Sequence, residues 1–315
     1  MSKTYDRTAE DVGNIVALEH VNLKVEDQGL ATLFYVSGLG LTRDPYMMTS
    51  IDNMWVNVGR SQFHLPTGGP AQRLRGRVGL VIDDREALLQ RLGTVAKALK
   101  GTRFAFVEKD GWIETTCPWG NTIRCHDPAP GDVMTLGMPY VEFDVAKGAA
   151  KPIAEFYRRI FGTMAYVDET GPTGAAPAAH VSVGMGQELI FRESEGEAPA
   201  YDGHHIQVYV ANFSGPHRAL LERGLITEES NQHQYRFETI VDLDGNRPLF
   251  RIEHEVRSLR NPMYARPLLN RNPRQTNRAY VPGRDFWVPE PVAVEMDNPR
   301  QATQERRLEA AVRRM

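Results

Sequence analysis

The sequence predicts an α+β protein made of paired βαβββ units in two tandem domains. The first observation is an internal repeat: the strand-like run at 19–25 and the turn Gly38-Leu39-Gly40 return as a run at 138–145 and Phe161-Gly162. The second is a break inside each half, Pro66–Pro70 in the first and the acidic loop Glu193–Ala200 in the second. Because repetition at a fixed order indicates duplicated supersecondary units, each half is expected to hold two of them.

Apolar and polar alternation, with Gly and Pro as breakers, places the elements of the first half. The first unit is expected to contain a strand at 18–25, a helix at 29–36 and strands near 41–48, 54–58 and 62–65. The second unit is expected to contain a strand at 77–82, a helix at 85–100 and strands near 103–108, 112–117 and 122–126. Asp83 or Asp84 is the expected N-cap of the second helix.

The second half repeats this order. We expect a strand at 139–145, a helix at 152–161 and strands near 164–168, 179–183 and 188–192, then a strand at 204–210, a short helix at 216–223 and strands near 235–241 and 249–256. The domain ranges are therefore an arm at 1–16, domains at 17–128 and 138–257, and a Pro/Arg-rich extension at 258–315. Repeated X-Pro pairs after Ser258, among them Asn261-Pro262, Arg266-Pro267, Asn272-Pro273 and Val281-Pro282, forbid long regular elements. This extension is therefore expected to wrap over the domains, with a solvated helix near 301–313.

Composition narrows the functional class. A formal charge of -3 over 315 residues does not indicate a nucleic-acid partner. No apolar run approaches the ~20 residues that span a bilayer, and the polar start at 1–13 is not a secretory signal, so we expect a cytoplasmic protein. Cys117 and Cys125 are expected as buried thiols, since disulfides are rare in a reducing cytosol. A small-molecule substrate is the expected partner, and a homo-oligomer stays open.

The repeated motifs resemble the vicinal oxygen chelate superfamily, which includes glyoxalase I, type I extradiol dioxygenases and bleomycin-resistance proteins. The resemblance covers about 18–256. It is carried by these motifs: His20-Val21-Asn22-Leu23-Lys24-Val25, Phe34-Tyr35, Leu39-Gly40, Phe156-Tyr157, Phe161-Gly162, His205-Ile206-Gln207-Val208-Tyr209-Val210 and Asp242-Leu243-Asp244-Gly245-Asn246. Each motif alone is weak evidence for the resemblance, which rests on the order and repetition of the motifs.

The resemblance implies a metal ion in the cleft of a curved sheet, held in extradiol members by His, His and Glu from three strands. Counting five residues back from the strand-ending valines places His20, Tyr140 and His205 at ligand positions. In the last strand the family's glutamate falls on Glu253, and its counterpart in the first half is Arg124. Ligands converge from separate strands because a site for a bidentate oxygen substrate needs open positions.

The first half then offers His20, Arg77 and Arg124, and two cations beside one imidazole would repel a metal ion. We therefore interpret that half as structural or as an anion-tolerant pocket. The second half offers Tyr140, His205 and Glu253, in which Tyr140 departs from the pattern. Glu142 shares the strand face with Tyr140 and is the expected third ligand beside His205 and Glu253, with Glu188 and Glu255 as alternatives.

Two residues are candidates for catalysis. Tyr140 is expected to line the pocket, and His233 lies about as far upstream of Glu253 as the acid/base histidine of extradiol-like members. Tyr201 and Tyr264 are weaker candidates for the mouth of the pocket.

The resemblance implies two functions. One is a metal-dependent enzyme, with Fe(II) or Mn(II), acting on a small oxygen-chelating substrate by extradiol-like ring cleavage of a catecholic compound or by glyoxalase-like proton transfer. The alternative is a metal-free protein that binds and sequesters a small molecule, as bleomycin-resistance relatives do. Tyr140 at a ligand position favours the alternative, whereas His205 with Glu253 favours the enzyme, which is the reading preferred here.

Overall fold

Four βαβββ units make up the computed structural model of the protein, which describes residues 5–45, 47, 50–129, 134–170, 175–196 and 199–268. A short 3-10 turn, η1 (Thr8–Glu10), precedes them. The first unit contains β1 (Ile15–Asn22), α1 (Gln28–Ala31), the π-helical turn η2 (Thr32–Gly38), β2 (Thr42–Arg43), β3 (Asn53–Val58) and β4 (Ser61–Pro66). The second contains β5 (Gly76–Val81), α2 (Arg85–Ala96), β6 (Ala105–Lys109), β7 (Trp112–Thr116) and β8 (Thr122–His126).

The third and fourth units follow the same order. The third contains β9 (Gly137–Ala146), α3 (Ala150–Phe156), the π-helical turn η3 (Tyr157–Phe161), β10 (Ala165–Asp168), β11 (Ala178–Gly184) and β12 (Gln187–Ser194). The fourth contains β13 (His205–Val210), α4 (Ser214–Glu222), β14 (Ile226–Asn231), β15 (Gln234–Val241) and β16 (Pro248–Ser258). The predicted fold class of paired βαβββ units is therefore confirmed.

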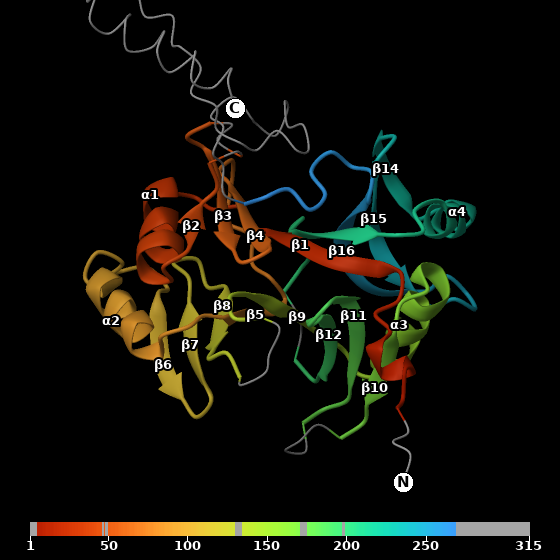
Figure 1. The fold of residues 1–315 in the computed structure, drawn as a ribbon, viewed down its shortest axis with the longest axis horizontal. Coiled ribbons are helices and arrows are strands. Elements are labelled where there is room, and N and C mark those ends of the chain that lie inside the picture. Colours follow the sequence, from red (N-terminus) through yellow and green to blue (C-terminus); the bar gives the residue numbers. More distant parts are fainter. Residues whose placement is uncertain are drawn as a thin grey trace, which may run out of the picture.

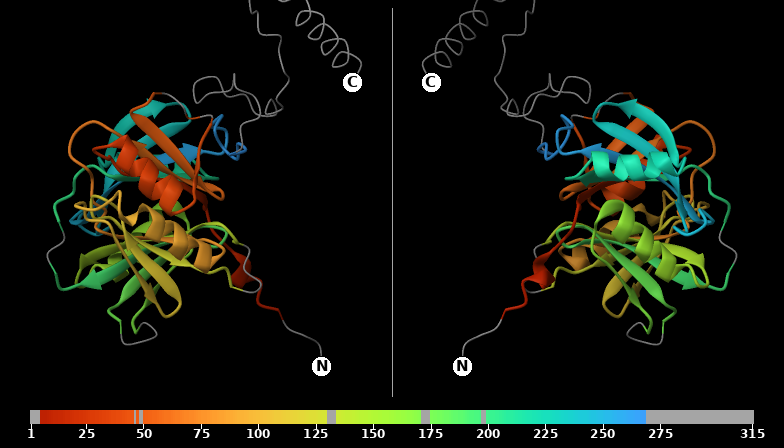
Figure 2. Two further views of the ribbon diagram at one scale, coloured as in Figure 1. Left: turned by 90° about the vertical axis from the view of Figure 1, so that its left-hand side faces the viewer. Right: turned by 90° about the vertical axis from the view of Figure 1, so that its right-hand side faces the viewer.

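The units combine into two mixed eight-stranded sheets, and each sheet joins the two halves of the sequence. The first sheet has the order β14-β15-β16-β13-β1-β4-β3-β2, and the second has the order β10-β11-β12-β9-β5-β8-β7-β6. The first and fourth units thus share the upper sheet of Figure 1, and the second and third share the lower one, as the side views of Figure 2 also show. We refer to them as the upper and lower sheets.

This pairing differs from our expectation that the two units of one half would form a sheet around their own site. The central contacts are the antiparallel pairs β1 with β13 and β5 with β9, which link distant units. Sequence order did not distinguish the two arrangements, because the same strands with the same faces serve both. The consequence is that ligand positions must be grouped by sheet and not by sequence half.

The helices do pack within each half. In the first half, the Phe34 ring of η2 meets Phe104 with centroids 5.9 Å apart, and Gly38 lies against Leu92 and Val95 of α2 closely enough that a Cβ would be 3.3 Å from Val95. In the second half, the rings of Phe156 and Phe237 are 6.0 Å apart, and each joins the buried core. Each half therefore packs apolar side chains of its helices against its other elements, while the sheets hold the halves together.

Local predictions and structure agree with a few differences. The Asp84 carboxylate accepts a hydrogen bond from the Ala87 amide at 3.0 Å and caps α2, as predicted. Both cysteines are buried free thiols, also as predicted. Strand β14 was not predicted, because its sequence Ile-Thr-Glu-Glu-Ser-Asn lacks an apolar face and lies at an exposed sheet edge. No helix in the described ranges is long and apolar enough to cross a membrane.

The chain after β16 returns over the upper sheet. Residues 259–268, called here the C-terminal segment, contain turns and no strand or helix. Met263 packs in a buried cluster with Met47 and Trp55, and the carbonyl of Leu268 accepts a hydrogen bond from the Asn57 amide at 2.8 Å. The helix expected near 301–313 lies outside the described residues.

Candidate metal centre

Three histidines from three adjacent strands meet on one face of the upper sheet. Asn22 of β1 is flanked by His205 of β13 on one side and by His64 of β4 on the other, and His20 lies two residues before Asn22 on the same face. One ring nitrogen from each histidine lies within 4.8 Å of the others. Imidazole is a common ligand of divalent transition metals, so the strand register has assembled a metal-site candidate.

Two of these imidazoles have the orientation of metal ligands. The Nδ1 atom of His20 lies 3.4 Å from the Glu19 carboxylate, and that of His205 lies 3.3 Å from the Glu253 carboxylate. Both Nε2 atoms are buried and have no hydrogen-bond partner within the part of the chain that the structure describes. A metal-bound histidine usually gives its second nitrogen to a carboxylate, so His20 and His205 fit a divalent ion through Nε2.

A local irregularity in β1 places Glu19 beside His20. The pairing of β1 with β13 shifts register between Leu18 and His20, as at a β-bulge. The Glu19 carboxylate accepts a hydrogen bond from the Tyr209 hydroxyl at 3.1 Å and pairs with Arg257 at 3.1 Å. Glu19 is 8% exposed, so these partners hold a buried carboxylate against the His20 ring.

His64 is held differently from the other two histidines. Its ring stacks on Trp55 with centroids 3.8 Å apart. Its Nδ1 lies 2.5 Å from the Asn22 amide nitrogen, and its Nε2 lies 2.6 Å from the Asn53 side-chain oxygen. Since Asn22 donates and Asn53 accepts, His64 is a neutral ring protonated at Nε2. Ligation by His64 would break the hydrogen bond to Asn22.

Glu255 is the carboxylate closest to the free nitrogen of His205. Its Oε2 lies 3.8 Å from His205 Nε2, whereas Glu253 faces the Nδ1 side of the same ring. Two arginines neutralise Glu255: Arg236 at 2.6 Å from Oε2 and Arg257 at 2.5 Å from Oε1. Of the two glutamates on β16, the geometry therefore favours Glu255 as a ligand and Glu253 as the group that orients His205.

Burial and charge set the protonation of this cluster. Burial, followed by the nearby charge of His20, holds the pKa of both His64 and His205 well below the usual value of 6.5. Burial raises the pKa of Glu255, but Arg257, His20 and Arg236 outweigh it and the net pKa is lowered. A neutral His205 beside an ionised Glu255 is the combination of protonation states that a metal site requires.

The C-terminal segment encloses the site from the side of β1, β3 and β4. The Tyr264 ring meets Tyr209 with centroids 4.9 Å apart. Arg266 is 5% exposed and contacts Asp44 at 3.0 Å and the Gln62 side-chain oxygen at 3.2 Å. Because Gln62 pairs with His20 in the sheet, the segment reaches the same face as the histidines. Tyr264 therefore lies beside Tyr209, whose hydroxyl donates a hydrogen bond to Glu19.

The lower sheet carries the other predicted residues, away from His205. Glu142 of β9 was expected beside His205 and Glu253, but its carboxylate is paired with Arg77 at 3.3 Å and with Arg192 at 3.0 Å in the lower sheet. Tyr140 lies on the same strand, and its hydroxyl lies 2.8 Å from Nε2 of His126. The structure does not bring these residues to the histidine cluster, because the third unit pairs with the second.

The remaining candidates of the lower sheet are also paired internally. Arg124 contacts Glu114 at 3.0 Å, and Glu188 contacts His180 at 3.0 Å. Burial raises the pKa of Tyr140 to about 12, so its hydroxyl stays protonated at neutral pH. This face of the lower sheet is thus filled by salt bridges where the upper sheet has histidines.

Two further candidates can be placed. His233 lies in the turn between β14 and β15, half-buried, and its backbone carbonyl accepts a hydrogen bond from the Ser258 amide at 3.0 Å. The Tyr201 hydroxyl donates to the His204 carbonyl at 2.9 Å and accepts from the Glu253 amide at 3.1 Å, which braces the entry to β13 and β16. Tyr201 therefore supports the strands that carry the site.

His20 was predicted to be structural, and no position in a site was predicted for His64. The signal for His20 was available, because it stands five residues before Val25, as His205 stands before Val210. Grouping it with Arg77 and Arg124 concealed its place in the histidine cluster, since those arginines belong to the lower sheet. His64 has a weaker signal, an imidazole on the last strand of the same unit as His20.

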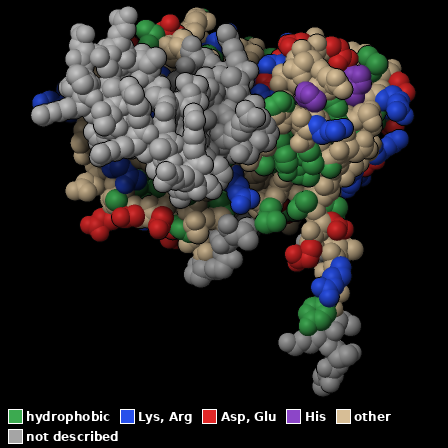
Figure 3. Space-filling model, turned by 45° about the horizontal axis from the view of Figure 1, so that its top comes forward, with side chains coloured by type: hydrophobic (Ala, Val, Ile, Leu, Met, Phe, Trp, Pro, Cys, Tyr) green, Lys and Arg blue, Asp and Glu red, His purple; other side chains and the backbone are tan. Residues whose placement is uncertain are grey.

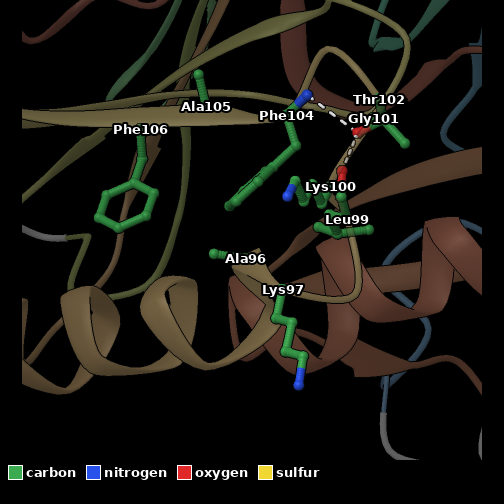
Figure 4. A pocket seen from close by; sticks show the side chains of 9 residues that line it. All are labelled: Ala96, Lys97, Leu99, Lys100, Gly101, Thr102, Phe104, Ala105 and Phe106. Atoms are coloured by element: carbon green, nitrogen blue, oxygen red, sulfur yellow. Dashed lines mark hydrogen bonds between the residues drawn. The ribbon is translucent and has the colours of Figure 1, made fainter.

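The surface hollow beside the end of α2 is not suited to metal binding. A hollow of about 570 Å³ lies between the end of α2 and β6, and Figure 4 shows Phe104, Phe106 and Lys97 around it. Its lining has no carboxylate, imidazole or thiol among the described residues. On the face shown in Figure 3, both acidic and basic side chains occur where grey atoms do not cover it, together with a group of hydrophobic side chains.

Comparison with known proteins supports the fold. No protein-family model and no curated protein sequence matches the chain. A putative dioxygenase from Bacillus subtilis subsp. subtilis str. 168 matches in structure with a TM-score of 0.51 at 13% identity, over 78% of this chain and 85% of that one. Glyoxalase I from Zea mays matches with a TM-score of 0.51 at 11% identity, over 76% and 92%. These matches and the two sheets of paired βαβββ units show that the chain has the fold of the vicinal oxygen chelate superfamily, as its motifs predicted.

Proposed function

We propose that the protein is a metal-dependent enzyme that acts on a small substrate with two neighbouring oxygens. The observation that carries the proposal is the pair of buried Nε2 atoms of His20 and His205, each without a partner in the described structure, on rings whose Nδ1 atoms face carboxylates. Leaving two buried nitrogens unpaired is costly unless a ligand takes them. A divalent ion, with Fe(II) or Mn(II) preferred for an imidazole and carboxylate set, meets that need.

The roles of the residues follow from their contacts. His20 and His205 would hold the ion through Nε2, and Glu255 would supply the carboxylate. Glu19 and Glu253 orient the two rings from their Nδ1 sides. His64 is an alternative imidazole ligand, and its hydrogen bonds to Asn22 and Asn53 fix its ring beside the site. Two imidazoles and one carboxylate leave coordination positions open for substrate.

The chemistry of such a site suits oxygen-rich substrates. When bound, a divalent ion supplies Lewis acidity that stabilises negative charge developing on neighbouring oxygens. Trp55, Met47 and Met263 give the site apolar walls next to the histidines, which favours an aromatic or similarly flat substrate and helps to exclude water. Extradiol-like ring cleavage of a catecholic compound is the reaction we propose first, and glyoxalase-like proton transfer is the second.

A metal-free binding protein is the alternative, and one observation favours it. Arg236 and Arg257 already neutralise Glu255, so the carboxylates of the site are paired without an ion. In that case the same apolar walls would sequester a small compound with no turnover.

Metal analysis of protein purified without a His-tag and without added metal tests the proposal. We expect about one equivalent of Fe or Mn in the wild type, and loss of that metal in His20→Ala and in His205→Ala, because two-ligand sites bind weakly. His126→Ala is the matched control, since His126 is a half-buried histidine of the lower sheet. Full metal content in both site variants, or no divalent metal in the wild type even after reconstitution, would favour the sequestering function instead.

A further inference from the structure

Arg236 has an unusual position at the edge of the candidate metal centre. It lies on β15 opposite Glu255 of β16, and its guanidinium bridges two carboxylates, Glu253 at 2.5 Å and Glu255 at 2.6 Å. Its side chain remains 20% exposed, whereas Glu255 is 4% exposed. The Arg236 guanidinium therefore reaches from solvent to a candidate metal ligand.

A metal ion at the site would compete with Arg236 for the same oxygen. The Oε2 atom of Glu255 is the oxygen nearest to His205 Nε2, at 3.8 Å, and it is also the oxygen that Arg236 contacts. Arg257 contacts the other oxygen of Glu255, Oε1, and also forms an ion pair with Glu19. Binding of the ion would thus release one end of the Arg236 guanidinium and leave the Arg257 pairs in place.

The net charge of the site favours a ligand that carries a negative charge. Three carboxylates, Glu19, Glu253 and Glu255, face two guanidinium groups, which gives a net charge of -1 for the group. Arg266 does not enter this count, because it pairs with Asp44. Glu228 lies 3.6 Å from Arg236 Nε but is also left out, because its side chain is 55% exposed and solvent weakens the effect of its charge on the buried groups. A divalent ion turns the group to +1, in a site with little solvent. Such a site gains most from a ligand that carries an anionic group besides its chelating oxygens.

We propose that Arg236 is a specificity-determining residue that binds a carboxylate or phosphoryl group of the substrate after the metal has taken Glu255. The proposal rests on the proposed metal-dependent function and names the substrate class as anionic. A guanidinium fork suits this task, because it binds two oxygens of one oxyanion at once. Metal and anion would then bind with positive coupling, since each makes the other's place available.

Mn²⁺ titration with and without inorganic phosphate tests this coupling, with free Mn²⁺ measured by electron paramagnetic resonance against a protein-free blank. In the wild type, millimolar phosphate should tighten Mn²⁺ binding by about tenfold, within the usual range of coupling between sites. Arg236→Gln should bind Mn²⁺ more tightly than the wild type without phosphate, because the competing cation is gone, and should lose the phosphate effect.

The control is Arg124→Gln in the lower sheet. Arg124 also bridges to a glutamate on the neighbouring strand, Glu114, and its side chain is 25% exposed. This variant should keep the wild-type phosphate effect. Equal enhancement by phosphate in Arg236→Gln would mean that the metal alone holds the anion and would overturn the proposal. Normal Mn²⁺ binding by the wild type without any phosphate effect would overturn it while leaving the metal-dependent function in place, whereas no Mn²⁺ binding at all would overturn both.

Discussion

Glu253 and Glu255 stand two residues apart on one strand, and charge-removing substitutions separate their roles. The sequence pattern favours Glu253 as the metal ligand, but the structure puts Glu255 on the Nε2 side of His205 and Glu253 on the Nδ1 side. Glu255→Gln should therefore abolish stoichiometric metal binding. Glu253→Gln should retain a metal site weakened by about 10- to 100-fold, the usual cost of losing a group that orients a ligand.

The two substitutions should also differ in stability. Glu255 is 3% exposed and pairs with two arginines, so its neutralisation leaves buried positive charge. Breaking a buried ion pair costs about 3–5 kcal/mol. Each arginine keeps a second carboxylate, so we expect a loss of about 3 kcal/mol. The Glu253 side chain is 19% exposed, and its removal leaves Arg236 paired with Glu255, so we expect about 1 kcal/mol.

Urea unfolding of the metal-free proteins measures the stability difference, and Mn²⁺ titration of the folded variants measures affinity. Both are needed, because a variant that fails to bind metal only because it unfolds would give no cooperative transition. Stoichiometric metal in Glu255→Gln together with its loss in Glu253→Gln would show that the family pattern identified the ligand and that our reading of the ring geometry is wrong.

Two further predictions concern residues that are not proposed as metal ligands. His254 is fully buried between the Tyr157 hydroxyl and the Ile252 carbonyl, and burial lowers its pKa to about 3. Between that value and the unfolded pKa of 6.5, the unfolded chain binds one proton more than the folded protein. The free energy of unfolding should therefore fall as the pH drops below 6.5, by about 2 kcal/mol at pH 5 from this group. Acid unfolding midpoints of wild type and His254→Gln measure this, and an unchanged pH slope in the variant would contradict it. Gly79→Ala would place a Cβ 2.3 Å from the Tyr140 ring, so we expect a loss of about 1–3 kcal/mol with unchanged metal affinity, and a metal defect in this variant would contradict the independence of the two sheets.

The sequence was sufficient for the units and for the equivalent strand positions of His20 and His205. Strand and helix positions followed from periodicity, and the strand-ending valines aligned His20 with His205, now found on adjacent strands. The sequence was insufficient for the partners of each unit. Pairing between strands about 190 positions apart, such as β1 with β13, cannot be recognised from the local sequence. A strand carries the same apolar face whichever unit supplies its partner.

The choice of pairing partner for each unit decides which side chains share a face with His20. If the first unit had paired with the second, His20 would have faced Arg77, and a metal ion would have been excluded by charge. The observed pairing collects the imidazoles in the upper sheet and the arginines Arg77 and Arg124 in the lower one.

The lower sheet shows why the two related faces need not share a function. Where the upper sheet leaves the Nε2 atoms of His20 and His205 unpaired among the described residues, the lower sheet pairs Glu142 with Arg77 and Arg192. A salt bridge satisfies its own charges and leaves no vacancy for a ligand, whereas unpaired buried nitrogens keep a free-energy cost that a bound ligand would remove. The duplicated fold therefore provides two equivalent faces, and side-chain pairing confines the candidate metal chemistry to one of them.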